Sequence, residues 1–147
     1  MEVRDQGLGV RGMRMELRLH PIGVVRSPLR DLDLAPKQGS EGAPDAWIEI
    51  DPAFAQALSG ISAGDELVVI TWLHRADREV LEVYPRDDRR RPLTGVFATR
   101  SEHRPNPLGL HRATVRELSG TRLRVGPIEA IDGTPVVDIK VAVNGGD

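Results

Sequence analysis

ATVREL at 113–118 is followed by RLRV at 122–125 and PVVDIKVAV at 135–143, and in these runs apolar and polar residues alternate. Successive side chains of a β-strand point to opposite faces, so the alternation predicts strands with one face on a core and the other toward water. A tight-turn dipeptide, Asp132-Gly133, precedes the last run, and Thr134-Pro135 restarts the chain in extended form. The stretch therefore favours a β fold.

Further short strand-like runs occur toward the N-terminus, separated by glycine, proline and aspartate. They are GVVRS (23–27), AWIEI (46–50), ELVVITWL (66–73), EVLEVY (79–84) and GVFAT (95–99). One short helix is predicted at 53–58 (AFAQAL), with Asp51 as its cap, Pro52 in its first turn and Gly60 beyond its end. Many short strands with one small helix predict a mainly all-β chain, an antiparallel barrel or sandwich.

The first eighteen residues have little apolar content and no consistent period. We expect a poorly ordered leader at 1–18 and a single domain at 19–147. Gly7, Gly9 and Gly12 have the spacing of the dinucleotide-binding motif. That motif requires a preceding strand and a following helix whose N-terminus faces the pyrophosphate. Neither is predicted here, which argues against a Rossmann site.

Composition excludes several classes of protein. The 147 residues contain no cysteine, which excludes disulfide scaffolds, cysteine nucleophiles and thiolate zinc sites. No apolar run reaches the length of a transmembrane helix, so we expect a soluble, cytoplasmic protein without membrane partners. The four histidines lack the spacing of zinc ligands, so no metal is expected, and no nucleophile elbow or Walker loop is present.

The residues FATRSEHRPNPLGLH at 97–111 predict a rigid, positively charged loop. Arginine, asparagine and histidine supply hydrogen-bond donors here, while Pro105 and Pro107 fix the backbone on both sides of Asn106. The surrounding stretch, 86–112, holds seven arginines against three acids, although the chain carries a net charge of −2. Such a patch suits phosphate or another anion, because guanidinium groups bind these bidentately. A solvated face is the alternative for the run Arg89 to Arg91.

Five segments, in this order, resemble the TsaA-like (TrmO-type) family of S-adenosylmethionine (SAM) dependent tRNA N6-methyltransferases. The resemblance covers about residues 20–143. The segments are IGVVRSP at 22–28, PKQ at 36–38, Trp72-Leu73-His74, TRSEHRPNPLGLH at 99–111 and DGTPVVDIK at 132–140.

The resemblance implies a compact antiparallel β-barrel, a homodimer, that binds SAM without a Rossmann fold. It implies that the cofactor contacts Pro36, Lys37, Gln38, Leu73, His74, Arg100, Leu110, Asp132, Gly133, Thr134 and Pro135. Arg100 would pair with the methionine carboxylate, and the backbone near Leu110 and the 132–135 turn would hold adenine and ribose. Taken singly, His74 and Asp132-Gly133 also fit purely structural roles at a strand end and a turn.

The reaction implied by the family is methylation of N6 of threonylcarbamoyl-adenosine, beside the anticodon of tRNA. The acceptor is a weakly nucleophilic ureido nitrogen, so help with its deprotonation is expected. We assign His74 as the candidate base and Arg104 and Asn106 as residues that position the substrate. The arginine patch would face tRNA phosphates.

Several residues depart from the family pattern. Lys37 replaces an arginine, Glu102 a proline and His111 a serine, which changes one bidentate contact, loop stiffness and one hydroxyl contact. The characterised bacterial enzyme carries an extra C-terminal domain that we expect this chain to lack. Two alternatives therefore stay open: a methyltransferase acting on a small molecule, and a noncatalytic barrel that binds SAM or RNA.

Overall fold

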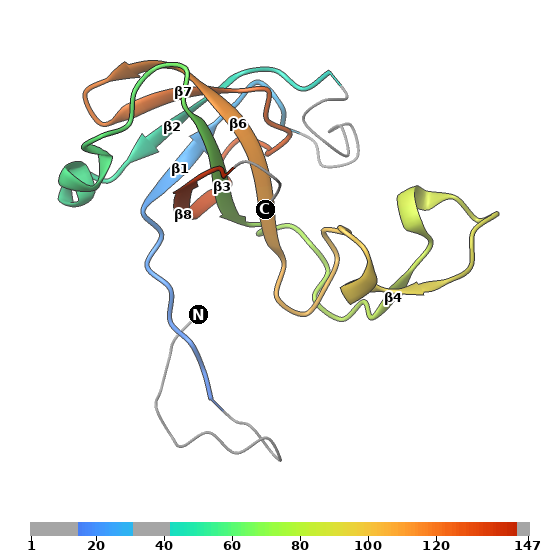
Figure 1. The fold of residues 1–147 in the computed structure, drawn as a ribbon. Helices are drawn as coiled ribbons and strands as arrows, with labels where there is room; N and C mark the ends of the chain where they lie inside the picture. The colour runs from blue at the N-terminus through green and yellow to red at the C-terminus, as the bar shows by residue number, and fades with distance from the viewer. Residues whose placement is uncertain (1–14, 31–41, 144–147) are drawn as a thin grey trace.

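A closed barrel of six antiparallel strands forms the body of the molecule (Figure 1). The structure, a computed structural model, describes residues 15–30 and 42–143. Around the barrel the strands follow the order β1-β2-β7-β6-β3-β8, and β8 closes onto β1. The strands are β1 (Gly23–Arg26), β2 (Ala46–Ile50), β3 (Glu66–Trp72), β6 (Leu108–Ser119), β7 (Arg122–Gly126) and β8 (Pro135–Val141). The predicted β-barrel is thus confirmed, and a sandwich is not formed.

The barrel interior is filled by branched aliphatic side chains, as the alternating sequence predicts. Strand β3 follows the pattern in part, because Leu67 and Val69 belong to the core and Ile70 and Trp72 are only half-buried, although Val68 is buried as well. Burying each such aliphatic side chain contributes about 1.5–3 kcal/mol. Other core members come from every strand, including Val25, Ile48, Val115, Leu123, Val125 and Val136.

The predicted helix at 53–58 is present as a 3-10 helix, η3 (Pro52–Leu58). The side chain of Asp51 accepts a hydrogen bond from the Ala53 amide at 2.9 Å, and Pro52 occupies the first turn, as predicted. Its residues are exposed or half-buried, and Phe54 and Leu58 pack against the barrel core. Two shorter 3-10 helices in the described part of the chain are η4 (Pro85–Asp87) and η5 (Val96–Ala98).

Two strand predictions are largely wrong. In the predicted strands at 79–84 and 95–99, only the two-residue strands β4 (Glu82–Val83) and β5 (Thr94–Gly95) form, and they pair with each other rather than with the barrel. The segment from Leu73 to Pro107 extends to one side of the barrel and carries this small sheet (Figure 1). Its apolar residues have little core to enter, and the side chain of Leu81 is 65% exposed.

The predicted loop at 97–111 ends earlier than expected, because β6 begins at Leu108. In the first residues of β6, Gly109 and His111 are buried while Leu108 and Leu110 are exposed. This pattern is the reverse of an ordinary amphipathic strand, so the start of β6 could not be recognised from the sequence.

The described residues include no helix long and apolar enough to span a bilayer.

Candidate functional site

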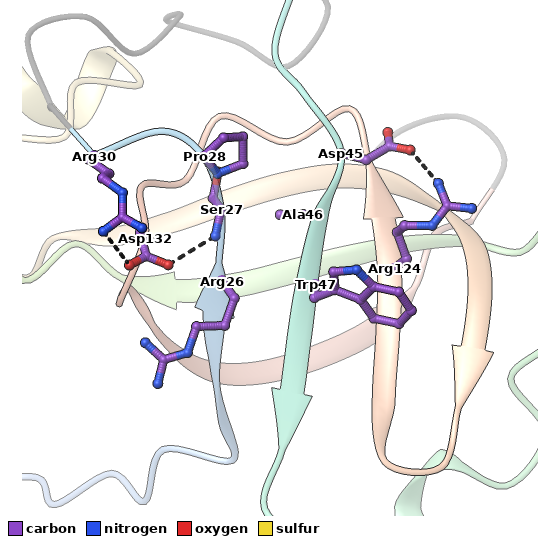
Figure 2. Close-up of a pocket in the computed structure, with 9 residues that line it drawn as sticks. All are labelled: Arg26, Ser27, Pro28, Arg30, Asp45, Ala46, Trp47, Arg124 and Asp132. Atoms are coloured by element: carbon purple, nitrogen blue, oxygen red, sulfur yellow. Dashed lines mark hydrogen bonds and ion pairs between the residues drawn. The ribbon is translucent and has the colours of Figure 1, made fainter.

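The Asp132-Gly133 turn is bound to the end of β1. The Asp132 amide donates to the Leu29 carbonyl at 2.6 Å, and its Oδ1 accepts from the Ser27 amide at 3.0 Å. The Gly133 amide donates to the Val25 carbonyl at 2.8 Å. Figure 2 shows the Asp132 carboxylate lying between Ser27 and Arg30. Asp132 therefore organises a neighbouring segment as well as its own turn.

Gly133 and Thr134 contribute to this turn in different ways. Gly133 has a φ of 83°, a left-handed conformation that favours glycine, and the space where a Cβ would project is open. Thr134 is 1% exposed, and its hydroxyl donates to the Ile131 carbonyl at 2.7 Å. Pro135 begins β8 opposite Val24. The turn thus offers a ligand its backbone and the Asp132 carboxylate, while the Thr134 hydroxyl is already used.

The segment after β3 contacts the same region. The guanidinium of Arg75 donates to the Arg30 carbonyl at 3.0 Å, and Arg30 lies 3.5 Å from Asp132 Oδ2. His74 is exposed in the turn that begins at Leu73. Two predicted segments, 73–74 and 132–135, are therefore linked through Arg30 and Arg75.

A third predicted segment, 100–107, is held against the 73–78 segment by Arg78. The Arg78 guanidinium donates to the Pro105 carbonyl at 2.7 Å and to Asn106 Oδ1 at 3.2 Å, and it also lies 5.1 Å from the centre of the Trp72 ring. The sequence analysis did not single out Arg78. A planar group with five donors suits a position that must bind two loop atoms and an aromatic face together.

Two more hydrogen bonds join these loops. The Leu73 amide donates to the Pro107 carbonyl at 2.8 Å, and the Asp77 amide donates to His103 Nδ1 at 2.9 Å. An imidazole nitrogen that accepts a hydrogen bond carries no proton, so Nε2 of His103 bears the hydrogen in the neutral ring. Cross-loop bonds therefore add to the two prolines in fixing the loop.

Arg104 and Arg100 differ sharply in their surroundings. The Arg104 guanidinium donates to the carbonyls of Val96 (2.7 Å), Thr99 (3.3 Å) and Ser101 (3.1 Å). Thr99 and Ser101 flank Arg100, so Arg104 holds the backbone on both sides of it. Arg100 itself is exposed and makes no hydrogen bond or ion pair with another described residue. The Arg100 side chain is therefore accessible from solvent.

Leu110 and His111 lie on opposite faces of β6. Leu110 is 42% exposed on the outer face, whereas His111 is 4% exposed inside the barrel. His111 Nε2 is 2.7 Å from the Thr71 hydroxyl, and its Nδ1 is 2.6 Å from Glu129. This buried polar chain connects β6, β3 and the segment before the 132–135 turn. The sequence marks His111 as a donor in the 97–111 loop and as a departure from the family pattern, but it does not reveal these partners.

The arginines between β4 and β5 are partly neutralised by their neighbours. Asp88 accepts hydrogen bonds from the side chain and amide of Arg90, which lower the pKa of the carboxyl group, and the same contact raises the pKa of Arg90. Arg91 also lies 3.8 Å from Asp88, and the Arg89 guanidinium lies 5.1 Å from the Tyr84 ring. The patch predicted at 86–112 is therefore less positive than its arginine count suggests.

The predicted site residues expose groups of both signs of charge. Arg100 offers a guanidinium, Asp132 a carboxylate that is 23% exposed, and Gly133 an open backbone, but no hydrogen bond or ion pair between described residues joins Arg100 to the 132–135 turn. Zwitterionic methionine with an attached nucleoside has groups complementary to each of these taken singly. Pro36, Lys37 and Gln38 lie outside the described residues. Among residues 15–30 and 42–143, no cluster of three or more metal-ligating side chains is present.

Comparison with known proteins gives a consistent result. Residues 24–147 match the family described as the tRNA-methyltransferase O N-terminal domain. A probable S-adenosyl-L-methionine-binding protein of Methanothermobacter thermautotrophicus is 44% identical over 126 residues, which are 86% of this chain and 90% of that protein. A protein of the same description from Archaeoglobus fulgidus is 45% identical over 126 residues, but these cover only 34% of its length.

A solved structure is also similar. The crystal structure of TrmO from Pseudomonas aeruginosa superimposes with a TM-score of 0.69 at 30% sequence identity. The match covers 88% of this chain and 57% of that chain. The present chain therefore spans little more than half the length of that TrmO chain.

Proposed function

The chain belongs to the family of the tRNA-methyltransferase O N-terminal domain, and on that premise we propose that it is a SAM-dependent methyltransferase that methylates N6 of threonylcarbamoyl-adenosine in tRNA. The supporting observation is the extent of the family match, which includes both the barrel and the two segments, 99–111 and 132–140, that carry the polar groups. The archaeal relatives described as probable SAM-binding proteins support the choice of cofactor.

In this proposal the cofactor contacts are divided among four segments of the chain. Arg100 pairs with the methionine carboxylate, while Leu73, Leu110 and the backbone of the 132–135 turn hold the nucleoside, together with Pro36, Lys37 and Gln38. Bound SAM supplies a methyl group on a cationic sulfur. What the protein adds is alignment of the acceptor nitrogen with that methyl group and removal of the nitrogen's proton.

His74 is the proposed base, because its imidazole is exposed at the end of β3 next to the expected cofactor segment. Arg104 and Asn106 act as positioning residues through the loop they stabilise, since their polar atoms are bonded to loop carbonyls and to Arg78. A His74→Gln variant, which keeps a hydrogen-bonding side chain beside the cofactor, is expected to lose turnover while it still binds SAM. Full turnover in this variant would exclude His74 as the base.

The proposed partner is tRNA, and the proposed location is the cytoplasm. The exposed arginines between β4 and β5 would contact phosphates, so tRNA affinity should fall as salt rises. We also propose a homodimer, supported by Leu108 and Leu110, which expose apolar surface on the outer face of β6. Light scattering of the purified protein at several concentrations measures the oligomeric state directly.

Transfer of labelled methyl from SAM into total tRNA from a strain lacking this gene tests the whole proposal. Label in methylated threonylcarbamoyl-adenosine, identified by nucleoside analysis, is the expected result. If SAM binds but tRNA stays unlabelled, the tRNA acceptor is wrong and a small-molecule acceptor or a binding role takes its place. If SAM does not bind, the methyltransferase proposal itself fails.

A further inference from the structure

A pocket of about 570 Å³ lies on the outer face of the barrel, where β1, β2 and β7 run side by side (Figure 2). Its wall includes Arg26, Trp47 and Arg124, which are directly opposed across the three strands. Arg30 and Asp132 complete one side. The pocket thus borders the Asp132 turn but lies on the β1-β2-β7 side of the barrel, away from Leu110 on β6.

Trp47 is the aromatic wall of this pocket. One of its contacts is with the Arg122 guanidinium, which lies 4.4 Å from the ring centre, a distance typical of a cation–π interaction. The side chain is only half-buried. An outward-facing tryptophan fixed by a stacked arginine, and open to a pocket, provides a rigid surface on which a planar ring can stack.

The charged residues around Trp47 retain donors for an anion. Arg124 uses one terminal nitrogen on Asp45 at 3.0 Å, and its Nε lies 3.3 Å from Glu117. The side chain of Arg30 is 78% exposed, and one of its terminal nitrogens lies 3.5 Å from Asp132 Oδ2. A guanidinium has five N–H donors, so each of these arginines can bind a phosphate oxygen while keeping its acidic neighbour.

Arg26 contributes less to the pocket than its position suggests. Its Nε donates to Glu49 at 2.7 Å, and Figure 2 shows its side chain turned away from Trp47. Arg30 and Arg124 are therefore the two arginines that remain available to a phosphate. The acids Asp45 and Asp132 beside them reduce the positive potential of the pocket. Stacking, rather than charge, should supply most of the affinity of this pocket.

We propose that this pocket binds one nucleotide of a single-stranded RNA segment, with the base on Trp47 and a phosphate on Arg30 or Arg124. A nucleotide joins an aromatic ring to an anion, which is the combination that the pocket presents. The choice of RNA rests on the proposed function, whereas the stacking site itself rests on the geometry alone. Because Asp132 belongs to both the pocket and the expected cofactor turn, RNA held here would lie beside the proposed cofactor site.

Tryptophan fluorescence gives a direct test, since the chain contains only Trp47 and Trp72. In a Trp72→Phe variant, which keeps an aromatic ring beside Arg78, Trp47 is the sole tryptophan. Titration with a short oligoadenylate should quench its emission in a saturable way, and inorganic polyphosphate should not. Absence of saturable quenching by oligoadenylate would overturn the proposal.

Substitution provides the second arm of the test. Trp47→Leu should weaken oligoadenylate binding about 5- to 100-fold, the loss expected for one stacked base, while Trp47→Phe should retain most of it. The matched control is Phe54→Leu, because Phe54 is also a partly exposed aromatic residue but lies on η3, outside this pocket. Equal losses in Trp47→Leu and Phe54→Leu, or no loss in Trp47→Leu, would refute the assignment.

This binding assay separates the two proposals. Oligoadenylate lacks the modified acceptor base, so its binding does not depend on methyl transfer. Stacking on Trp47 without methylation of tRNA would support the pocket and reject the proposed function. Methylation of tRNA with no effect of Trp47→Leu on RNA affinity would support the proposed function and reject the pocket as an RNA site.

Discussion

The buried contact between His111 and Glu129 makes a strong prediction about stability. With Glu129 ionised, its carboxylate can only accept, so the hydrogen on His111 must be on Nδ1. In the neutral ring Nε2 then accepts from the Thr71 hydroxyl. Both nitrogens of the His111 ring therefore have a hydrogen-bond partner. Glu129→Ala removes the acceptor and leaves an N–H group in the barrel interior.

The size of the effect follows from burial. A buried donor without a partner costs about 1–3 kcal/mol, and breaking a buried ion pair about 3–5 kcal/mol if the ring is charged. The side chains of His111 and Glu129 are 4% and 18% exposed. We therefore expect Glu129→Ala to lower the free energy of unfolding by at least about 1 kcal/mol, and Glu129→Gln, which keeps an acceptor oxygen, to lower it less.

Urea unfolding measures this difference, and the chain offers a matched control. Glu102 and His103 form a second glutamate–histidine contact, at 3.6 Å, with side chains that are 29% and 35% exposed. Glu102→Ala should cost less than about 1 kcal/mol, as exposed pairs do. With a urea m-value of about 1–3 kcal/mol/M, a loss of 2 kcal/mol moves the midpoint by roughly 1 M. Equal midpoints for the two variants would refute the reasoning.

Three further predictions concern single contacts. Gly109→Ala should destabilise by about 1–3 kcal/mol in the same unfolding assay, because a Cβ would lie 2.6 Å from the buried Thr71 hydroxyl; unchanged stability would show that the barrel relaxes. Arg78→Gln should weaken SAM binding in calorimetry by releasing the loop, without a comparable loss of stability, and unchanged affinity would contradict this. NMR titration should find the Asp88 pKa below its ordinary value, and Arg90→Gln should raise it; because the folded-state pKa is depressed, any stabilisation is present at neutral pH and lost as pH falls through it.

The barrel strands could be predicted where the alternation of inward and outward side chains decides the burial of each residue. In β2 the observed bounds, Ala46–Ile50, are those that alternation predicts, since alternate side chains enter the core. The prediction failed at 79–84 (EVLEVY), where apolar residues typical of strands are present but the segment lies off the barrel and Leu81 stays exposed. Strand propensity reports residues that fit a half-buried sheet surface and cannot say whether a core is close enough to cover it.

The beginning of β6 shows a different limit. An inward histidine at 111 is compatible with a core only because Thr71 and Glu129 bind its two nitrogens, and these partners lie 40 and 18 residues away in the sequence. The same limit applies to Arg78, whose loop partners are 27 and 28 residues distant. The local Asp132-Gly133 turn was predictable, whereas contacts made only by folding were not.

The loop at 97–107 shows how contacts within the folded loop separate roles that the sequence leaves equivalent. Arg100 and Arg104 are both arginines of one polar loop, but the Arg104 guanidinium is bound to the carbonyls on either side of Arg100. Bonds to a charged donor are among the stronger hydrogen bonds, so they restrict the backbone from which the Arg100 side chain extends. A carboxylate ligand of Arg100 would then meet a side chain whose anchor point is already fixed, and less ordering entropy would oppose binding. On the proposed function, Arg104 would then contribute to ligand affinity without contacting the ligand.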